Sequence, residues 1–425
     1  MWLTFRKNFK KMRRQFQLIV WGASGFTGQL VCEYLLEKYP GEELKWAMAG
    51  RSTPKLKEIQ RKLQCDHIPI LEADSNHLES LKKMVSQTAV ILSVVGPYSL
   101  YGSHLIEACI REKTDYCDLS GEVHWMRKMI DRWQKEAVNA GVRLVNSCGF
   151  DSVPSDLGVL YMQKQAEKEL GQPLRNISMR VKKIKGGVSG GTIASMFNIR
   201  KEAEKDRSIY RIIMRRYSLN PDPEWDGPDE RDLKTVKWDP VSNSWISPFI
   251  MGTINTRIVR RTQALVNYPY GKEFTYDEAI DCGSGFSGKW KGWLKILPLG
   301  LIRAAKPGTF LYKAVRNFLP KPGQGPSREK IQSGSFEFWF YGWNQPEEVY
   351  LFRLSGKRDP GYGATARMLA ESGVCMVKDR SKTPDLSGFL TPASALGESL
   401  IKRLEKHADM QFSDVQNISE FRGGG

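Results

Sequence analysis

Three glycines spaced three residues apart, Gly22, Gly25 and Gly28, stand directly after an apolar run at 16–21. The run has the composition of a buried strand, and a helical pattern begins soon after it. In such a turn the first glycine permits a tight bend, the second lets a diphosphate approach the backbone, and the third lets the helix pack against the strand. The amide groups and the dipole at the helix start attract phosphate. The spacing predicts a dinucleotide-binding turn, with a purely structural turn as the alternative.

The candidate cofactor-binding residues of this turn are Gly22, Ser24, Gly25, Phe26, Thr27 and Gly28. A second apolar run, at 46–49, ends in Gly50 and Arg51. NAD-preferring sites usually place an acidic residue here to bind the ribose 2′-hydroxyl, whereas a small residue followed by arginine accommodates a 2′-phosphate. We therefore predict NADP(H) as the cofactor, bound in part by Arg51. An arginine that only faces solvent is the alternative.

The nicotinamide end of the predicted site follows the run at 89–95, which is apolar enough for a central strand. This run leads into Gly96, Pro97 and Tyr98, and loops at the carboxyl ends of parallel strands line the ligand crevice. We predict that these three residues flank the nicotinamide. The cofactor would supply the hydride and the protein one proton donor, for which Tyr98 is our candidate catalytic residue. A tyrosine that only packs is an equally good interpretation.

Two further segments are candidates for binding the substrate. Asp151 follows the strand predicted at 142–146, where its carboxylate would polarise a substrate or orient the nicotinamide carboxamide; a turn stabilised by capping is the alternative. Gly190, Gly191 and Thr192 end a glycine-rich turn before a helical pattern. Backbone amides at such a helix start would bind a substrate oxygen, unless the turn is purely structural.

Alternating strand and helix patterns position these motifs over residues 16–150. Strands are expected at 16–21, 45–49, 67–71, 89–94, 115–118 and 142–146, and helices at 27–38, 54–63, 77–86, 103–112 and 123–140. Alternation with short connections predicts the α/β class and a Rossmann-type, doubly wound parallel sheet.

A second α/β (α+β) domain is expected at 151–384. We expect strands at 177–185, 334–343 and 348–356, helices at 155–169, 193–205 and 365–378, and an irregular excursion at 206–245. Residues 256–262 fit either a helix or a strand. A last amphipathic helix is expected at 391–406, within the C-terminal segment 385–425.

Composition sets the broad class. The chain has 425 residues, enough for two domains, and 41% hydrophobic residues, typical of an ordered globular protein. The net charge of +17 is compatible with nucleic acid, a membrane surface or a phosphorylated ligand as partner. The seven cysteines include no CxxC pair and fit reduced core thiols in a cytosol-facing protein. The five histidines show no metal-ligand spacing, so we predict no metal site.

Two basic, partly apolar segments indicate a surface partner. The leader, 1–15, holds six Lys or Arg and no acid, and is a mitochondrial presequence, a membrane-surface helix or a solvated tail. Residues 282–328 hold nine Lys or Arg and no acid among many Trp, Leu and Phe. Charges interrupt this segment, and Pro298 and Pro307 are expected to break helix, so it suits a membrane interface rather than a span. A buried core helix is the alternative, and no base-reading motif supports nucleic acid as a partner.

Together these motifs resemble the saccharopine dehydrogenase-like oxidoreductases of animals, over nearly the whole chain after residue 15. The resemblance rests on GASGFTG at 22–28, AGRS at 49–52, VGPY at 95–98, DLSGE at 118–122, GFDSVPSDLG at 149–158, SGGT at 189–192, PGYGAT at 360–365 and LTPASALG at 390–397. It implies a Rossmann domain, a second α/β domain related to saccharopine reductase, and a C-terminal helix that returns to the first domain.

The resemblance also implies NADP(H)-linked redox chemistry, with a lipid as one candidate substrate, because bacterial relatives include trans-acting enoyl reductases of glycolipid synthesis. Members are associated with lipid droplets, mitochondria and membranes. We therefore expect this protein on a lipid droplet or a cytosol-facing membrane, with the mitochondrion as a further location and a homodimer left open. The family transfers no catalytic residue to this chain.

Three hypotheses follow from the sequence. The first is an NADP(H)-dependent oxidoreductase acting on a lipid-like or otherwise apolar carbonyl or enoyl substrate. The second is a lipid-surface protein that binds NADP(H) without turnover. The third, saccharopine metabolism, would need convergent arginines for a dicarboxylate, and the cluster available in the second domain is Arg257, Arg260 and Arg261.

Overall fold

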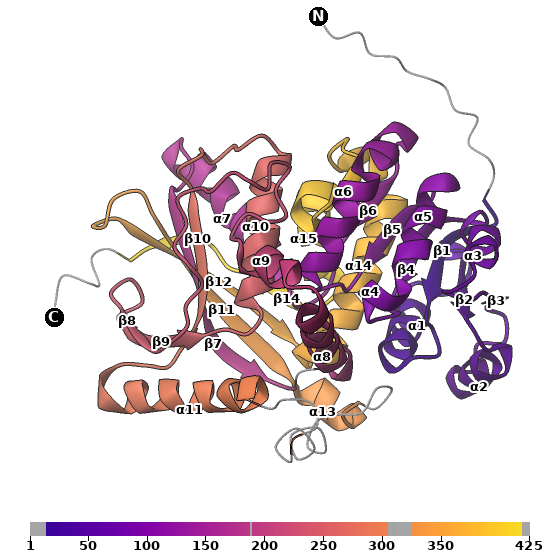
Figure 1. Ribbon diagram of the computed structural model, residues 1–425, viewed down its shortest axis with the longest axis horizontal. Coiled ribbons are helices and arrows are strands. Elements are labelled where there is room, and N and C mark those ends of the chain that lie inside the picture. Colours follow the sequence, from indigo (N-terminus) through magenta and orange to yellow (C-terminus); the bar gives the residue numbers. More distant parts are fainter. Residues whose placement is uncertain (1–13, 188, 305–308, 310–324, 419–425) are drawn as a thin grey trace, which may run out of the picture.

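Two β-sheets stand side by side in the computed structural model, which describes residues 14–187, 189–304, 309 and 325–418 (Figure 1). The first is a parallel sheet in the order β13-β6-β5-β4-β1-β2-β3. Its strands are β1 (Phe16–Trp21), β2 (Trp46–Gly50), β3 (Ile70–Glu72), β4 (Thr88–Ser93), β5 (Asp115–Asp118), β6 (Arg143–Val145) and β13 (Gly388–Leu390). The strand order reverses between β1 and β4, which confirms the predicted doubly wound sheet.

Helices cover both faces of the first sheet because its strands are apolar on both sides. One face packs against α1 (Phe26–Lys38) and α14 (Thr365–Lys378). The other packs against α3 (Leu78–Val85), α5 (Ser103–Arg111) and α6 (Val123–Ala140). The remaining helices of this part are α2 (Thr53–Leu63), α4 (Tyr98–Tyr101) and a short 3₁₀ turn at Gly41–Glu43.

The second sheet is mixed and has the order β14-β12-β11-β7-β10-β9-β8, with β15 paired to β12. Its strands are β7 (Asn176–Lys185), β8 (Lys237–Asp239), β9 (Ser244–Pro248), β10 (Thr275–Asp281), β11 (Ser335–Trp343), β12 (Val349–Lys357), β14 (Met410–Phe412) and β15 (Gln416–Asn417). β7 and β10 pair in parallel, whereas the other pairs are antiparallel. The second α+β domain predicted from the sequence is therefore present.

The helices between and around the sheets are α7 (Val153–Leu170), α8 (Gly190–Lys205), α9 (Ser208–Met214), α10 (Gly252–Leu265), α11 (Gly285–Ala304), α13 (Arg328–Ser333) and α15 (Pro392–His407). A π-helical turn at Pro360–Ala364 precedes α14, and a 3₁₀ turn at Arg380–Lys382 follows it. Residues 256–262, which the sequence left undecided, lie in α10. Helix α11 runs through Pro298, so the break expected there is absent. The other expected break, at Pro307, and residues 1–13 of the leader lie outside the described residues.

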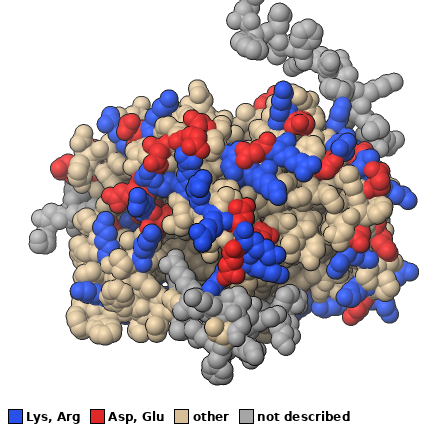
Figure 2. Space-filling view, viewed as in Figure 1, with Lys and Arg blue, Asp and Glu red and all other residues tan. Residues whose placement is uncertain are grey.

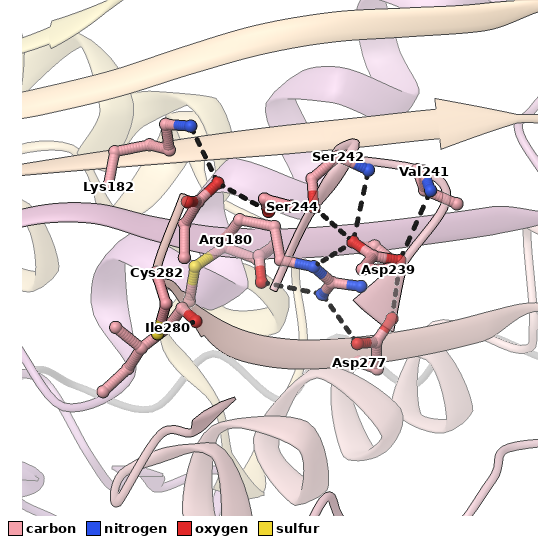
Figure 3. A network of polar contacts seen from close by, with 12 residues as sticks. Arg180, Lys182, Asp239, Val241, Ser242, Ser244, Asp277, Ile280 and Cys282 are labelled. Carbon is pink, nitrogen blue, oxygen red and sulfur yellow. Dashed lines mark hydrogen bonds and ion pairs between the residues drawn. The ribbon is translucent and has the colours of Figure 1, made fainter. Parts of the chain in front are cut away.

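A charge network around the buried Arg180 fixes β8 at the edge of the second sheet (Figure 3). Alternation along β7 sends Met179 and Val181 into the core and Arg180 to the opposite face. There Arg180 forms ion pairs with Asp239 of β8 at 2.8 Å and Asp277 of β10 at 2.7 Å. Burial alone would lower the pKa of Arg180, but the two carboxylates raise it, so the guanidinium stays charged. The network fixes the edge of the sheet beside α11.

The C-terminal part divides differently from the predicted boundary at 384/385. Helix α14, expected in the second domain, packs on β4 and β5 of the first sheet. Strands β14 and β15, from the segment 385–425, extend the second sheet instead. Helix α15 packs against both α14 and α7, and β13 joins the first sheet beside β6, as expected for a returning C-terminal segment (Figure 1). One continuous hydrophobic core therefore joins the two sheets.

Candidate active site

A cleft of about 580 Å³, which we call the cofactor cleft, opens at the carboxyl ends of β1, β2 and β4. This is the position where doubly wound sheets bind nucleotides. The predicted cofactor residues that line it are Gly22, Ser24, Gly25, Phe26, Thr27, Gly28, Arg51, Gly96 and Pro97. Tyr98 does not line the cleft and instead lines the cavity next to it. The structure thus brings the separate sequence motifs together in one place.

The turn after β1 has the geometry that its glycines predict. Gly22 has a φ of +91°, and a Cβ there would lie 2.6 Å from Val95. A Cβ on Gly28 would lie 2.2 Å from the carbonyl oxygen of Gly22, so α1 can start this close to the turn only with glycine. Gly25 is exposed to the cleft, and the first amides of α1 lack intrahelical acceptors. This cradle fits the diphosphate of a dinucleotide.

The far end of the cleft carries positive charge. Arg51 is exposed there and forms no ion pair with the described residues. Ser52 and Lys55 line the same end, and neither was predicted from the sequence as a cofactor-binding residue. The spacing could have identified Lys55, because it stands four residues after Arg51, about one helical turn, in the first turn of α2. Two cations at the start of a helix fit a 2′-phosphate.

Glu122 fixes the opposite end of the cleft. Its carboxylate accepts hydrogen bonds from the backbone N–H groups of Tyr98 at 2.7 Å and Ser99 at 2.9 Å. It also accepts a hydrogen bond at 2.8 Å from the hydroxyl of Ser195, on α8. Glu122 therefore ties the turn after β4 to a helix of the second domain. Glu122 was not predicted as a site residue, because its partners are distant along the chain.

The structure does not support Tyr98 as the proton donor. Its hydroxyl donates to the carbonyl oxygen of Ser93 at 3.0 Å and accepts from the N–H of Leu119 at 3.1 Å. Burial raises the pKa of Tyr98 well above its ordinary value, and the carboxylate of Asp118 raises it further. The hydroxyl already donates its proton to one backbone group and accepts from another, so it is not free to donate to a substrate, and the prediction of Tyr98 as catalytic acid is corrected. The side chain holds the strand ends of β4 and β5 together.

A second cavity, of about 230 Å³, adjoins the cofactor cleft, and we call it the apolar cavity. Thr27, Val94, Gly96 and Gly191 line both spaces. Nine further residues of its wall are apolar and come from both domains, namely Leu119, Phe150, Ile184, Met196, Ile199, Phe249, Ile250, Met251 and Ile254. A hydrophobic ligand in this cavity would therefore meet the end of the cofactor cleft.

Asp151 is the one charged residue among the described residues that line the apolar cavity. Burial raises the pKa of its carboxyl group to about 6. The predicted glycine-rich turn also lies here, with Gly191 and Thr192 on the cavity wall and Gly190 in the cofactor cleft. All four predicted substrate residues therefore line one of the two spaces, and Gly191 lines both.

Two of the backbone donors predicted for a substrate oxygen are already used. The N–H of Gly190 donates to the hydroxyl of Tyr362 at 2.8 Å, and the N–H of Thr192 donates to the Ser189 hydroxyl at 3.0 Å. The Ser189 side chain is thus the cap of α8. The expectation that these two amides bind substrate is corrected, because capping the helix consumes them. The amide of Gly191 is not used by either bond.

The arginine cluster considered for a dicarboxylate is structural. The three side chains project from α10 and are buried. Arg257 pairs with Asp232 at 2.7 Å, Arg260 pairs with Asp229 at 2.7 Å, and Arg261 donates to backbone carbonyl groups. They hold the excursion at 206–245 in place, and none lines the apolar cavity. Within the part of the chain that the structure describes, no group of His, Cys, Asp or Glu residues could hold a metal ion.

The sheet order and the cleft define a two-domain protein of the dinucleotide-binding class. Comparison with protein families matches residues 18–145 to the Saccharopine dehydrogenase NADP binding domain, so NADP(H) is the cofactor. The cradle and the two cations described above fit this cofactor.

Two trans-acting enoyl reductases are similar to the whole chain: that of Mycobacterium ulcerans is 33% identical, and that of Mycobacterium tuberculosis is 32% identical. A second M. tuberculosis protein, to which that activity is assigned provisionally, is 36% identical. Each alignment spans 92% of this chain and 96% of the relative. The chain belongs to the family of these proteins and is an NADP(H)-dependent oxidoreductase.

The structure also resembles apo saccharopine dehydrogenase (L-Glu forming) from Saccharomyces cerevisiae. The TM-score is 0.53 at 10% identity, over 95% of this chain and 99% of the other. This likeness confirms the fold predicted from the resemblance. The sequence relatives are mycobacterial, so the assignment to the animal members in particular is not supported.

Proposed function

We propose that this protein reduces the carbon–carbon double bond of an α,β-unsaturated acyl compound with NADPH. The observation that carries the proposal is the wall shared by the cofactor cleft and the apolar cavity, formed by Thr27, Val94, Gly96 and Gly191. An acyl chain in the apolar cavity would present its reacting carbons at this wall. The names of the relatives support the same reaction, because they are enoyl reductases.

The residues would divide the work as follows. The turn from Gly22 to Gly28 holds the diphosphate, and Arg51 with Lys55 holds the 2′-phosphate. NADPH supplies the hydride. The apolar wall orders the acyl chain and excludes water, which would otherwise compete in the proton transfer. Glu122 joins the turn after β4 to α8 and so fixes the position of the two domains around the reacting atoms.

The direct test is the oxidation of NADPH by the purified full chain with trans-2-octenoyl-CoA as a probe. We expect consumption of NADPH and formation of octanoyl-CoA, which mass spectrometry detects. The matched control is octanoyl-CoA, which has no double bond and should consume no NADPH. Consumption with 3-oxo-octanoyl-CoA but not with the enoyl compound would contradict the proposal and indicate a carbonyl reductase.

Binding of NADP(H) without turnover is the alternative that the same assay addresses. It would show as tight NADPH binding by calorimetry together with no oxidation of NADPH by any enoyl or keto lipid. A dicarboxylate substrate has less support, because Arg257, Arg260 and Arg261 are committed to other protein groups and no cation lines the apolar cavity in the described residues.

We also propose that α11 lies on an anionic lipid surface. Its exposed large apolar side chains recur at helical spacing and are Phe286, Trp290, Trp293, Leu294 and Leu297. Lysines at 289, 291 and 295 accompany them. In Figure 2 the part of the surface where Figure 1 places α11, at the lower left, is mostly tan with few charged side chains. Aromatic and aliphatic side chains beside lysines are typical of interfacial helices.

No helix in the described residues is long and apolar enough to cross a membrane. The lipid droplet, the cytosol-facing membrane and the mitochondrion stay predictions. The predicted homodimer also stays a prediction, which sedimentation analysis would test.

Vesicle flotation tests the role of α11. We expect binding to phosphatidylcholine vesicles that contain phosphatidylserine, with weaker binding at high salt. The double change Trp290→Glu and Leu294→Glu should lower the bound fraction at least about tenfold, because two large side chains no longer enter the interface. The matched control is Met214→Glu, an exposed apolar residue on α9, which should bind as the unchanged protein does. Equal binding by both variants would contradict the proposal.

A further inference from the structure

Desolvation raises the pKa of four carboxyl groups in the described chain to about 6 or 7. They are Asp118 and Asp151, at about 6, and Asp156 and Glu278, at about 7. Three of them are buried, and Asp151 is partly buried. A desolvated carboxyl group with such a pKa is protonated for part of the time near neutral pH, so it can give or take a proton. The four differ in what surrounds them, and that difference decides which of them is free to react.

Three of these groups serve as hydrogen-bond acceptors inside the protein. Asp118 accepts from four donors, which are a tyrosine hydroxyl of β5 and three groups in the loops after β5 and β6, two of them backbone amides. Asp156 accepts from the Thr262 hydroxyl and from the N–H of Ala393 at 2.8 Å. Glu278 accepts from an amide side chain and a tyrosine hydroxyl of the second domain. Each of them therefore organises the fold and has its oxygens committed.

The carboxyl group of Asp151 accepts no hydrogen bond from the described residues, and burial is the whole cause of its raised pKa. It also lines the apolar cavity, unlike the other three. The backbone on either side of it is anchored: the N–H of Phe150 donates to the Thr365 hydroxyl at 3.2 Å, and the hydroxyl of Ser152 donates to Asn255 at 3.1 Å. The turn thus holds one unused acid at a fixed place in the cavity wall.

The other proton-bearing groups of the wall are mostly occupied. The hydroxyl of Ser147 donates to the Ser120 carbonyl oxygen at 2.6 Å, that of Ser195 donates to Glu122, and that of Thr365 donates to the Pro360 carbonyl oxygen at 2.7 Å. Tyr98 is committed in the same way. A carboxylic acid is also a far stronger acid than any of these alcohols, so it is the better donor to a carbon or an enolate oxygen.

We infer that Asp151 is the catalytic acid that protonates the substrate at its α-carbon, an inference that rests on the proposed enoyl reduction. The substrate accepts the hydride of NADPH at its β-carbon, and the π pair of the double bond moves toward the carbonyl oxygen. The α-carbon then takes the proton of the Asp151 carboxyl group. The products are NADP⁺, the saturated acyl compound and the Asp151 carboxylate, which regains a proton from water.

The surroundings of Asp151 predict a simple pH dependence. Tyr98 is the only other titratable side chain in the described wall of the cavity, and its pKa lies well above the neutral range. Behind the turn, Glu278 binds the side chain of Asn255, to which Ser152 is also bonded, and Asp118 lies behind the neighbouring loops. None of these groups contributes to the shift of Asp151. Loss of the reactive form with rising pH should therefore follow Asp151 itself.

The test compares Asp151→Asn and Asp151→Glu with the unchanged protein. In single turnovers with saturating NADPH and trans-2-octenoyl-CoA, the asparagine variant should react about 100- to 1000-fold more slowly. Its NADPH affinity, measured by calorimetry, should stay within about twofold, because Asp151 does not line the cofactor cleft. The glutamate variant should regain part of the rate, since it restores the acid.

Two readouts do not depend on the rate of the variant. Carbon-13 spectra of carboxyl-labelled aspartates in the cofactor-free protein should show two resonances that titrate near pH 6, from Asp118 and Asp151. One of the two should be missing in Asp151→Asn. The single-turnover rate of the unchanged protein should fall above about pH 6, and this pH profile needs no variant, so it decides the matter should the asparagine variant fail to fold.

The overturning results are distinct. An asparagine variant within threefold of the unchanged protein, or a rate constant between pH 5 and pH 8 that does not change, would remove Asp151 from the reaction and leave the proposed function standing. No reduction of the probe by the unchanged protein would overturn the proposed function, and this inference with it.

Discussion

The cofactor cleft and the apolar cavity share a wall, yet they are built in opposite ways. The cleft comes mainly from turns at the carboxyl ends of β1, β2 and β4 in one sheet. The cavity comes from segments as distant as Leu119, Met196, Ile254 and Thr365, in both domains. Phosphate recognition needs backbone geometry, which a short motif can encode, whereas an apolar cavity exists only after distant elements have packed.

The two spaces also differ in charge. The cleft ends in two cations, Arg51 and Lys55, that face solvent, while the cavity contains a single acid, Asp151, in apolar surroundings. Exposed charges are suited to binding a phosphate that arrives from water. A lone acid in such surroundings is suited to giving up a proton. The cleft is therefore suited to binding the cofactor and the cavity to the reaction of the substrate. A change in one space should affect one of these two functions more than the other.

The largest effect is expected from the glycine turn of the cofactor cleft. In Gly28→Ala the new Cβ would lie 2.2 Å from the Gly22 carbonyl oxygen, so α1 must move away from the turn. We expect the free energy of unfolding to fall by about 1–3 kcal/mol and NADPH binding to weaken by about 100-fold or more. Denaturant titration and calorimetry measure the two quantities.

Gly25→Ala is the matched control for that change. Its Cβ would lie 3.3 Å from the same oxygen and would point to an exposed position. The free energy of unfolding should change by less than about 0.5 kcal/mol, while NADPH binding should still weaken, because the methyl group stands where the diphosphate approaches. Equal affinity in Gly25→Ala and the unchanged protein would show that the diphosphate binds elsewhere.

The next effect concerns the apolar cavity. Met196→Trp places a larger side chain in the wall contributed by α8. We expect kcat/KM for the octenoyl probe to fall by about 30-fold, because the acyl chain loses room, and the affinity for NADPH to stay within twofold. Steady-state kinetics with calorimetry separates the two. An unchanged KM would mean that the substrate does not enter this cavity.

A smaller effect is expected at the far end of the cleft. Arg51→Ala should weaken NADPH binding by about 10- to 100-fold, the loss of a charge-assisted hydrogen bond to phosphate, and leave NADH binding unchanged. Arg61→Ala is the matched control, because Arg61 lies on α2, the helix that follows Arg51, and does not line the cleft. A similar loss of NADH affinity in Arg51→Ala would indicate a general effect on the fold.

The difference between the two spaces explains what the sequence could predict. The parallel sheet, the turn at Gly22 and the position of Arg51 follow from local patterns, and the structure places them as expected. Glu122 was missed because the groups that it binds come near it only in the folded chain. Lys55 was missed because its role depends on which side of α2 faces the cleft. The cavity wall could not be predicted, since Met196 and Ile254 meet only when α8 and α10 pack beside the first sheet.

The error over Tyr98 has the same origin. Its place after β4 is readable from the sequence, but the acceptor at Ser93 and the donor at Leu119 are fixed by pairing of β4 with β5. The structural role of the arginines of α10 could not be predicted either. Their carboxylate partners lie in the excursion at 206–245, whose path no local pattern specifies. Local chemistry identified candidate groups, and only the packed structure separates the committed ones from the free ones.

The smallest effect on turnover is expected from Tyr98→Phe. This change tests directly whether the Tyr98 hydroxyl is a committed structural group or a free acid. Removing the hydroxyl leaves the carbonyl oxygen of Ser93 and the N–H of Leu119 without their partner in the core. The free energy of unfolding should fall by about 1–3 kcal/mol, while turnover per folded molecule should change by less than about threefold. Tyr210→Phe, at an exposed position on α9, controls for loss of a phenol and should change neither quantity. A stable Tyr98→Phe protein that lost most of its turnover would make the tyrosine the acid after all, because a hydroxyl that only braces two strands cannot be removed without cost to the fold.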